Sequence, residues 1–136
     1  MFEVVYYSLT GRTRKVAEAI ASELGVPAED VKTKDGLAED SVVFLGAGLY
    51  GPLRAFGFKR FIGSNQFRGR KVAVFGTSGG GKGIEVEALA DAVTAEGAEV
   101  VGRFNCRGRF LFLLWNHPTR SDLDRAKRFA REVAEG

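Results

Sequence analysis

The sequence predicts an α/β fold in which parallel strands alternate with helices. Short runs of β-branched and aromatic residues mark strands at 2–7, 41–45, 71–75 and 99–104. Between these runs, apolar residues recur at intervals of three and four, which is the period of a helix. Strands that alternate with helices pair in parallel through right-handed crossovers. We therefore expect a parallel sheet covered by helices.

Length and composition bound the class of protein. A chain of 136 residues, 45% of them hydrophobic, is long enough for a buried core, and we expect one domain over residues 1–136. The single cysteine excludes an internal disulfide framework and suits a reducing compartment. The first strand begins at Phe2 without a signal segment, and no apolar run is long enough to cross a bilayer. We expect a cytoplasmic protein that does not bind a membrane.

In the first half of the chain, the strand at 2–7 is followed by a helix that Gly25 ends. The inward positions of this helix are Val16, Ala17, Ile20, Ala21 and Leu24. A short edge strand is expected at 31–33. The strand at 41–45 then leads into a loop over 46–52, whose glycines allow close approach of a ligand. A short helix is expected over 53–62.

In the second half, the strand at 71–75 leads into a glycine-rich loop over 76–81. A helix follows, with inward residues Ile84, Ala88, Leu89, Ala92 and Val93. The strand at 99–104 precedes an irregular, aromatic-rich segment over 105–118. Thr119 and Asp122 are spaced as in a capping box, which opens a last helix. The inward positions of that helix are Leu123, Ala126, Phe129, Ala130 and Val133.

A polar segment with the chemistry of an anion site separates the first strand from the first helix. Its sequence is Ser8-Leu9-Thr10-Gly11-Arg12-Thr13. Hydroxyl groups can donate to anionic oxygens, and a glycine lets the backbone come close. The helix N-terminus points its free N–H groups at the same place. These features predict a phosphate site, and the alternative is an ordinary polar turn between a strand and a helix.

The same segment resembles the phosphate loop of flavodoxins, T/S-x-T-G-x-T, although Arg12 stands where the best-known members carry Asn. The resemblance extends over nearly the whole chain. The late block Cys106-Arg107-Gly108, with His117-Pro118, is similar to a group of short flavodoxin-like proteins. The resemblance implies a doubly wound parallel sheet of strand order 2-1-3-4-5, with helices on both faces.

The resemblance also implies an FMN site made of three loops at the carboxyl ends of the strands. The first loop would hold the 5′-phosphate, and the other two would hold the isoalloxazine ring. The expected cofactor-binding residues are Ser8, Leu9, Thr10, Gly11, Arg12, Thr13, Ala47, Gly48, Leu49, Tyr50, Gly51, Thr77, Ser78, Gly79 and Gly80. Tyr50 is expected to stack on the flavin, and its alternative is to pack over the sheet edge. Because the third loop has no aromatic residue, Trp115 or Phe110 could cover the other face of the ring, with core packing as the alternative for each.

Other sequence features argue against further chemistry. Residues 76–83 fit the nucleotide-triphosphate pattern G-x-x-x-x-G-K, but Gly83 follows Lys82 where a Mg²⁺-binding hydroxyl is needed. A single histidine excludes a histidine-based metal cluster. Cys106 has the character of a small buried apolar residue. We therefore expect neither catalytic residues nor a metal site.

The charge is unevenly distributed over the chain. The net charge is +3, yet no acidic residue occurs between Ser41 and Ile84 or between Val100 and Ser121. The cations expected near the flavin are Arg12, Arg14, Lys15, Arg54 and Lys82, with Arg107 and Arg109. Arg68, Arg70 and Lys71 are expected as solvated charge at the far end of the sheet. A basic flavin end predicts that the reduction potential is less negative than in acidic flavodoxins. It also predicts a redox partner with an acidic surface. Because the sequence contains no nucleic-acid-binding motif, we do not expect nucleic acid as a partner.

Three functions fit these observations. The first is an FMN-binding carrier that delivers electrons to a partner redox enzyme, which the short loops favour. The second is an FMN-dependent NAD(P)H:quinone-type oxidoreductase, which usually needs longer loops or a dimer for a second pocket. The third is a flavodoxin-fold interaction module that no longer binds FMN. The oligomeric state is left open by the sequence.

Overall fold

The computed structural model describes residues 1–8, 11–48, 56–78, 84–107 and 119–136. The chain order of the elements is β1 (Phe2–Tyr7), α1 (Arg12–Leu24), β2 (Ala28–Asp30), β3 (Val42–Gly48), α2 (Phe56–Ser64), β4 (Lys71–Ser78), α3 (Ile84–Ala95), β5 (Glu99–Arg107) and α4 (Arg120–Glu135). The expected start of α2, at 53–55, and the segment 108–118 lie outside the described residues.

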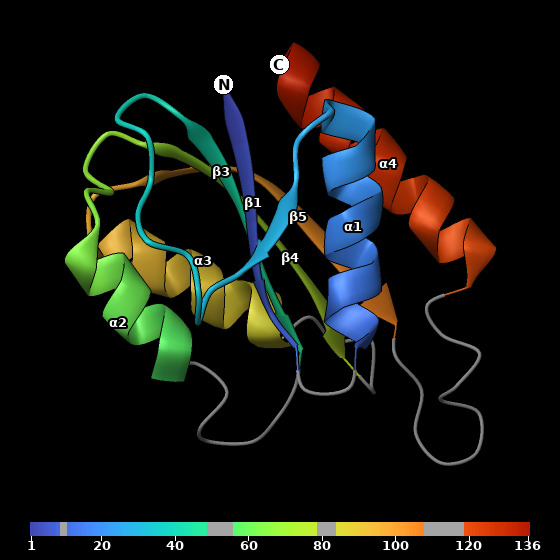
Figure 1. The fold of residues 1–136 in the computed structure, drawn as a ribbon, viewed down its shortest axis with the longest axis horizontal. Coiled ribbons are helices and arrows are strands. Elements are labelled where there is room, and N and C mark those ends of the chain that lie inside the picture. Colours follow the sequence, from blue (N-terminus) through green and yellow to red (C-terminus); the bar gives the residue numbers. More distant parts are fainter. Residues whose placement is uncertain (9–10, 49–55, 79–83, 108–118) are drawn as a thin grey trace.

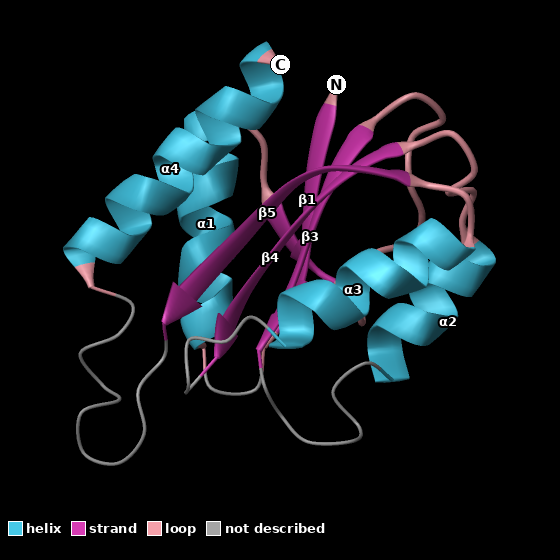
Figure 2. Cartoon of the chain, turned by 180° about the vertical axis from the view of Figure 1, so that it is seen from behind, coloured by secondary structure: helices cyan, strands magenta, loops and turns pink. Residues whose placement is uncertain are grey.

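The strands form a parallel sheet of order β2-β1-β3-β4-β5. Helices α1 and α4 cover one face of the sheet, and α2 and α3 cover the other (Figures 1 and 2). This confirms the predicted doubly wound topology. The order also means that β1 lies between β2 and β3, so the chain changes direction across the sheet at the pair β1–β3.

Both faces of the sheet are buried, because successive side chains of a strand point to opposite faces. On the α2/α3 face, Val5, Leu45 and Val74 pack with Phe58 and Leu89. On the α1/α4 face, Phe44 and Phe75 pack with residues of the two helices, including Ile20 and Phe129. Burial on two faces explains why the strands read as continuous apolar runs rather than as alternating patterns.

Gly46 has a packing role in the centre of the sheet. A methyl group at Gly46 would lie 2.5 Å or less from three atoms of the Phe75 ring. Phe75 is completely buried, with 0% of the residue exposed. The ring therefore lies directly over the β3 backbone. Any larger residue at Gly46 would have to displace either the ring or the strand.

The strands β3, β4 and β5 continue further than the sequence predicts. Ala47 and Gly48 belong to β3, and Thr77 and Ser78 belong to β4, although both pairs were expected in loops. The ladder explains the difference, because Gly48 pairs with Thr77 and Ser78 pairs with Arg107. Residues 105–107, expected as irregular, likewise extend β5.

The edge strand β2 lies three residues before its predicted position at 31–33. Its residues Ala28 to Asp30 pair with Val4 to Tyr6 of β1. The prediction was wrong because Asp30 turns the chain: its carboxylate accepts the Lys32 amide at 2.8 Å. Val31 is nevertheless buried, with 6% exposure, and its amide donates to the Tyr6 carbonyl at 2.8 Å. Val31 is therefore apolar because it is buried next to β1, although it lies outside β2.

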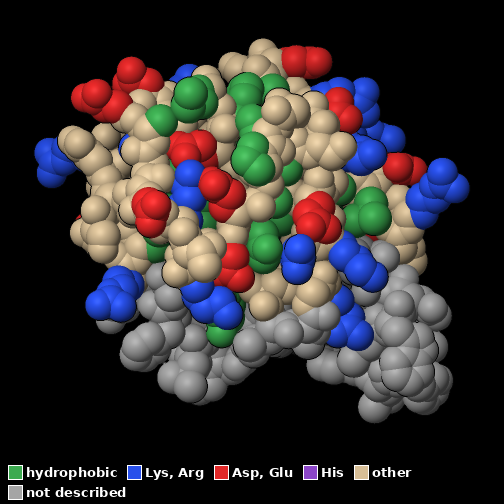
Figure 3. Space-filling model, in the orientation of Figure 1, with side chains coloured by type: hydrophobic (Ala, Val, Ile, Leu, Met, Phe, Trp, Pro, Cys, Tyr) green, Lys and Arg blue, Asp and Glu red, His purple; other side chains and the backbone are tan. Residues whose placement is uncertain are grey.

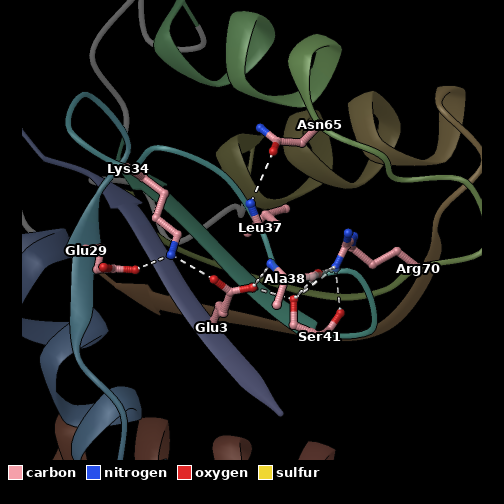
Figure 4. Close-up of polar contacts among 8 residues, drawn as sticks. All are labelled: Glu3, Glu29, Lys34, Leu37, Ala38, Ser41, Asn65 and Arg70. Atoms are coloured by element: carbon pink, nitrogen blue, oxygen red, sulfur yellow. Dashed lines mark hydrogen bonds and ion pairs between the residues drawn. The ribbon is translucent and has the colours of Figure 1, made fainter.

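Arg70 is not solvated charge as expected, because only 8% of the residue is exposed. Its Nη1 donates to the Ser41 carbonyl, to the Ser41 hydroxyl and to the Ala38 carbonyl, each at 2.9 Å (Figure 4). Its Nε donates to the Gln66 carbonyl at 2.8 Å. The guanidinium thus joins the segment before β3 to the segment before β4. Neighbouring Arg68 and Lys71 are exposed, as predicted.

An ion-pair network continues from Ser41 to Glu3 of β1 (Figure 4). Lys34 Nζ lies 2.7 Å from Glu3 and 2.5 Å from Glu29. Burial by itself would raise the pKa of Glu3, but hydrogen bonds from Lys34, Ser41 and the Ala38 amide outweigh it and hold the pKa below its ordinary value. The network fixes the connection between β2 and β3 against the sheet.

Helix ends follow the predicted local chemistry. Gly25 ends α1 in the left-handed conformation, with φ of 72°. At the start of α4, the Thr119 amide donates to the Asp122 carboxylate at 2.8 Å, and the Asp122 amide donates to the Thr119 hydroxyl at 3.2 Å. These two bonds confirm the predicted capping box, and the apolar positions expected inward on α4 do pack against the sheet.

Candidate functional site

The carboxyl ends of the central strands meet at one edge of the sheet, which is the lower edge in Figure 1. Tyr7 of β1 is in register with Ala47 of β3, and Gly48 is in register with Thr77 of β4. The three segments expected to bind a ligand therefore leave the sheet side by side. In an open parallel sheet, this edge at the change of chain direction is where ligands bind.

The first segment is built around Gly11. Its φ of 87° is a left-handed conformation that glycine adopts without strain, and its amide donates to the Ser8 hydroxyl at 3.0 Å. Accepting this bond leaves the Ser8 hydroxyl proton able to donate. Helix α1 begins at the next residue, Arg12, and the Lys15 amide donates to the Gly11 carbonyl at 3.1 Å.

The N-terminus of α1 has the electrostatics of an anion site. Gly11 is its N-cap and has no side chain to cap the amides of the first turn, which carry the positive end of the helix dipole. The first turn contains no acidic residue, whereas Arg12, Arg14 and Lys15 are all cations. Cations at this end of a helix are unfavourable by themselves, so the arrangement favours a bound anion.

A direct bond connects the first and third segments. The hydroxyl groups of Thr13 and Thr77 lie 2.9 Å apart, although the residues are 64 positions apart in the chain. Thr13 is 0% exposed and Thr77 is 7% exposed. Sequence reasoning placed both residues in the site but gave no sign of this bond. The only available signal was the shared β4 face of Thr77 and Phe75, since residues two apart point to the same side.

The remaining predicted residues divide into two groups. Ala47 and Gly48 are buried at the end of β3, and Ser78 ends β4. Leu9, Thr10, Leu49, Tyr50, Gly51, Gly79 and Gly80 lie outside the described residues, as do Phe110, Trp115 and His117. The expected stacking of Tyr50 therefore stays a prediction.

Several basic side chains lie along the described part of this edge. In Figure 3, Lys and Arg side chains gather on the lower part of the view, the side toward which the strands point in Figure 1. Lys15 is exposed, and Lys32 Nζ lies 5.7 Å from the centre of the Tyr7 ring. Arg14 is paired with Glu18 at 3.1 Å, but both side chains are more than half exposed, so water screens the pair. Burial raises the pKa of Tyr6 near the end of β1, so this phenol adds no negative charge at neutral pH.

Other candidate sites offer less. Glu39, Asp40, Gln66, Arg68 and Lys71 line a polar hollow at the opposite, amino-terminal edge of the sheet. Its mixed charges select no ligand class. Among the described residues, no group of three or more His, Cys, Asp or Glu side chains could hold a metal ion. Within the same ranges, no helix combines the length and the apolarity needed to cross a membrane.

Comparison with known proteins identifies the family. The family model described as a flavodoxin domain matches residues 3–114. A flavodoxin from Clostridium beijerinckii is 33% identical over 110 residues, which cover 73% of this chain and 80% of that protein.

Solved structures agree with this match. The oxidised Flavodoxin 1 of Bacillus cereus superposes with a TM-score of 0.79 at 21% identity, covering 98% of this chain and 97% of that one. The Fusobacterium nucleatum flavodoxin bound to flavin mononucleotide superposes with a TM-score of 0.67 at 16% identity, covering 98% and 96%. At these identities, the solved structures show only that the fold is shared. The family model and the C. beijerinckii relative show that this chain is a member of the family. This chain belongs to the flavodoxin domain family.

Proposed function

We propose that this protein binds FMN at the carboxyl edge of its sheet and carries electrons to a partner redox protein. When bound, FMN supplies the redox chemistry, because its ring can accept and return electrons. The F. nucleatum flavodoxin, which has this fold, is bound to FMN. The single cysteine is consistent with work in a reducing compartment such as the cytoplasm.

The observation that carries the proposal is the start of α1. An N-terminus that Gly11 cannot cap with a side chain, the Ser8 hydroxyl held by the Gly11 amide, and a first turn with three cations and no acidic residue suit the phosphate of FMN. A phosphate there would receive backbone N–H bonds and neutralise the repulsion between the cations and the helix dipole. This donor set fits a doubly charged phosphate better than it fits an uncharged ligand.

The ring of FMN would lie at the ends of β3 and β4. Ala47 and Gly48 leave little side-chain volume there, so a planar ring can approach the backbone closely. In this proposal Leu49, Tyr50 and Gly51 follow on one side, with Tyr50 stacked on the ring. Ser78, Gly79 and Gly80 line the other side.

A basic edge favours an acidic partner. Lys15 and Lys32 are exposed, and Arg12 is half-buried. Opposite charge on a partner would steer the two proteins together and orient them before electron transfer. Because such steering acts between solvated charges, the rate of electron transfer to the partner should fall steeply as salt is raised.

The first test is an FMN titration of the purified protein. We expect flavin fluorescence to be quenched in a one-to-one complex, and the flavin absorbance to co-elute with the protein. A folded protein that leaves FMN fluorescence unchanged would contradict the proposal and favour the interaction module.

A second measurement separates the carrier from the oxidoreductase. The FMN-loaded protein is mixed with NADH or NADPH and a quinone, without any other protein. A carrier should show no sustained consumption of the nicotinamide. Steady turnover by the protein alone would replace the carrier with the oxidoreductase.

A further inference from the structure

We propose that Thr77 is a positioning residue for the phosphate group: its buried hydroxyl holds the Thr13 hydroxyl and so sets how tightly the N-terminus of α1 binds phosphate. This inference rests on the proposed FMN site. It gives Thr77 a role different from the ring contact expected from the sequence. Thr77 would act through Thr13, without touching the flavin ring.

The geometry of β4 directs Thr77 toward α1. Ala73 and Phe75 face the α1/α4 side of the sheet, and Thr77, two residues further on, faces the same side. There its hydroxyl meets that of Thr13 in the first turn of α1, at 2.9 Å. Since both residues are almost completely buried, water competes little for either hydroxyl.

A bond of this kind fixes the conformation of Thr13. A threonine in a helix has two accessible χ1 rotamers, because its hydroxyl can turn toward different partners. The bond to Thr77 selects the rotamer that points toward the end of β4. Thr13 has one hydroxyl proton and accepts up to two hydrogen bonds. When Thr77 donates the bond between them, Thr13 acts as the acceptor, and its own proton can be directed to a phosphate oxygen.

The same contact ties the three segments of the site together. The backbone of Thr77 is in register with Gly48 on one side and Cys106 on the other. Its side chain reaches Thr13 in the first turn of α1, the helix that follows β1 in the chain. A displacement at the end of β4 would therefore be transmitted to the first turn of α1.

The test compares Thr77→Val, which keeps the shape and removes the hydroxyl, with Thr77→Ser, which keeps the hydroxyl. Dissociation constants for FMN and for riboflavin, which lacks the phosphate, are measured by fluorescence quenching. We expect Thr77→Val to weaken FMN about 5- to 20-fold, the loss typical of a buried hydrogen bond, and riboflavin less than about 2-fold. Thr77→Ser should stay within about 2-fold for both ligands. Equal weakening of FMN and riboflavin, or no weakening of FMN, would overturn the inference.

Two further measurements complete the test. If Thr77 acts through Thr13, the Thr13→Val/Thr77→Val double variant should bind FMN no more weakly than Thr13→Val alone, whereas additive losses would contradict the inference. Thermal stabilisation by inorganic phosphate, at ionic strength matched with KCl, is measured without flavin. Stabilisation that Thr77→Val reduces supports the positioning role even if the wild-type protein fails to bind FMN, which would reject only the proposed function. The absence of both phosphate stabilisation and FMN binding would reject both.

Discussion

Replacing Gly46 by alanine tests how strictly the packing of the sheet fixes the ligand edge. The added methyl group would lie 2.5 Å or less from three atoms of the Phe75 ring. Carbon atoms in ordinary contact are about 3.5–4.0 Å apart, so either the ring or the strand must move by roughly 1 Å or more. Neither can move freely, because Phe75 is 0% exposed and β3 is hydrogen-bonded on both sides.

The expected net effect is destabilisation. Alanine restricts the unfolded chain and so gains about 0.5–1 kcal/mol relative to glycine. Forcing an extra methyl group into a fully packed core costs about 1–3 kcal/mol, and more where the backbone is held. We therefore expect Gly46→Ala to lower the free energy of unfolding by about 1–3 kcal/mol. Because Gly46 lies two residues before the end of β3 and Phe75 three residues before the end of β4, both close to the ligand edge, we also expect weaker FMN binding.

The assay is urea unfolding of the protein without flavin, followed by circular dichroism. Gly63→Ala in α2 is the matched control, since a methyl group there meets nothing within 4 Å. It should be neutral or stabilising by up to about 1 kcal/mol. In the Phe75→Leu background, the cost of Gly46→Ala should fall by at least about half. A Gly46→Ala protein as stable as wild type, or a cost unchanged by Phe75→Leu, would refute the packing argument.

Three further predictions concern charge and backbone. Hydrogen bonds outweigh the opposing effect of burial and hold the pKa of Glu3 below 4.5. The stability that they provide is therefore present above pH 4.5 and is lost as the pH falls through the lower pKa of the native state. The difference in urea midpoint between wild type and Glu3→Gln should shrink from pH 6 to pH 3, and a constant difference would disprove this. One unit charge at about 10 Å changes an energy by about 0.4–1.7 kcal/mol, or roughly 20–70 mV. Lys15→Gln should therefore lower the potential of the last one-electron step in the reduction of bound FMN by that amount at low salt. Lys71→Gln at the opposite edge should not, and equal shifts would count against a local effect. Gly11→Ala and Gly25→Ala both place alanine at positive φ, 87° and 72°. Each should lower the free energy of unfolding by about 1–2 kcal/mol. Only Gly11→Ala should also weaken FMN binding, and similar losses of affinity in both variants would argue against Gly11 as part of the site.

Much of the fold could be predicted because each central strand is buried on two faces and therefore reads as an apolar run. The start of β1 and the capping box of α4 are local signals, and the structure confirms both. The ends of β3 and β4 are different, because their glycines and hydroxyl residues look like loop residues. Only pairing with neighbouring strands, such as Gly48 with Thr77, makes them part of the sheet. Pairing between distant segments leaves no local pattern in one sequence.

In the candidate site, too, the local features could be predicted and the contacts between distant segments could not. The anion-binding chemistry of residues 8–13 is local, since strand, turn and helix follow one another directly. The Thr13–Thr77 bond joins residues 64 positions apart and could not be predicted from spacing. Arg70 was predicted wrongly for a related reason. Its position before a strand suggests exposure, and its acceptors are carbonyls of segments up to 32 residues away, which no composition rule reveals.

The two outer strands of the sheet bear on how copies of this protein behave at high concentration. An unpaired strand edge can recruit the edge of another molecule and start aggregation. At one side, β2 is only three residues long. At the other, β5 is longer, but its register shifts opposite Val72 and Ala73, and Arg103 projects beside Glu87 at 3.0 Å. A short edge on one side and an irregular, charged edge on the other discourage strand pairing between molecules, so concentrated protein is protected from aggregation through its sheet.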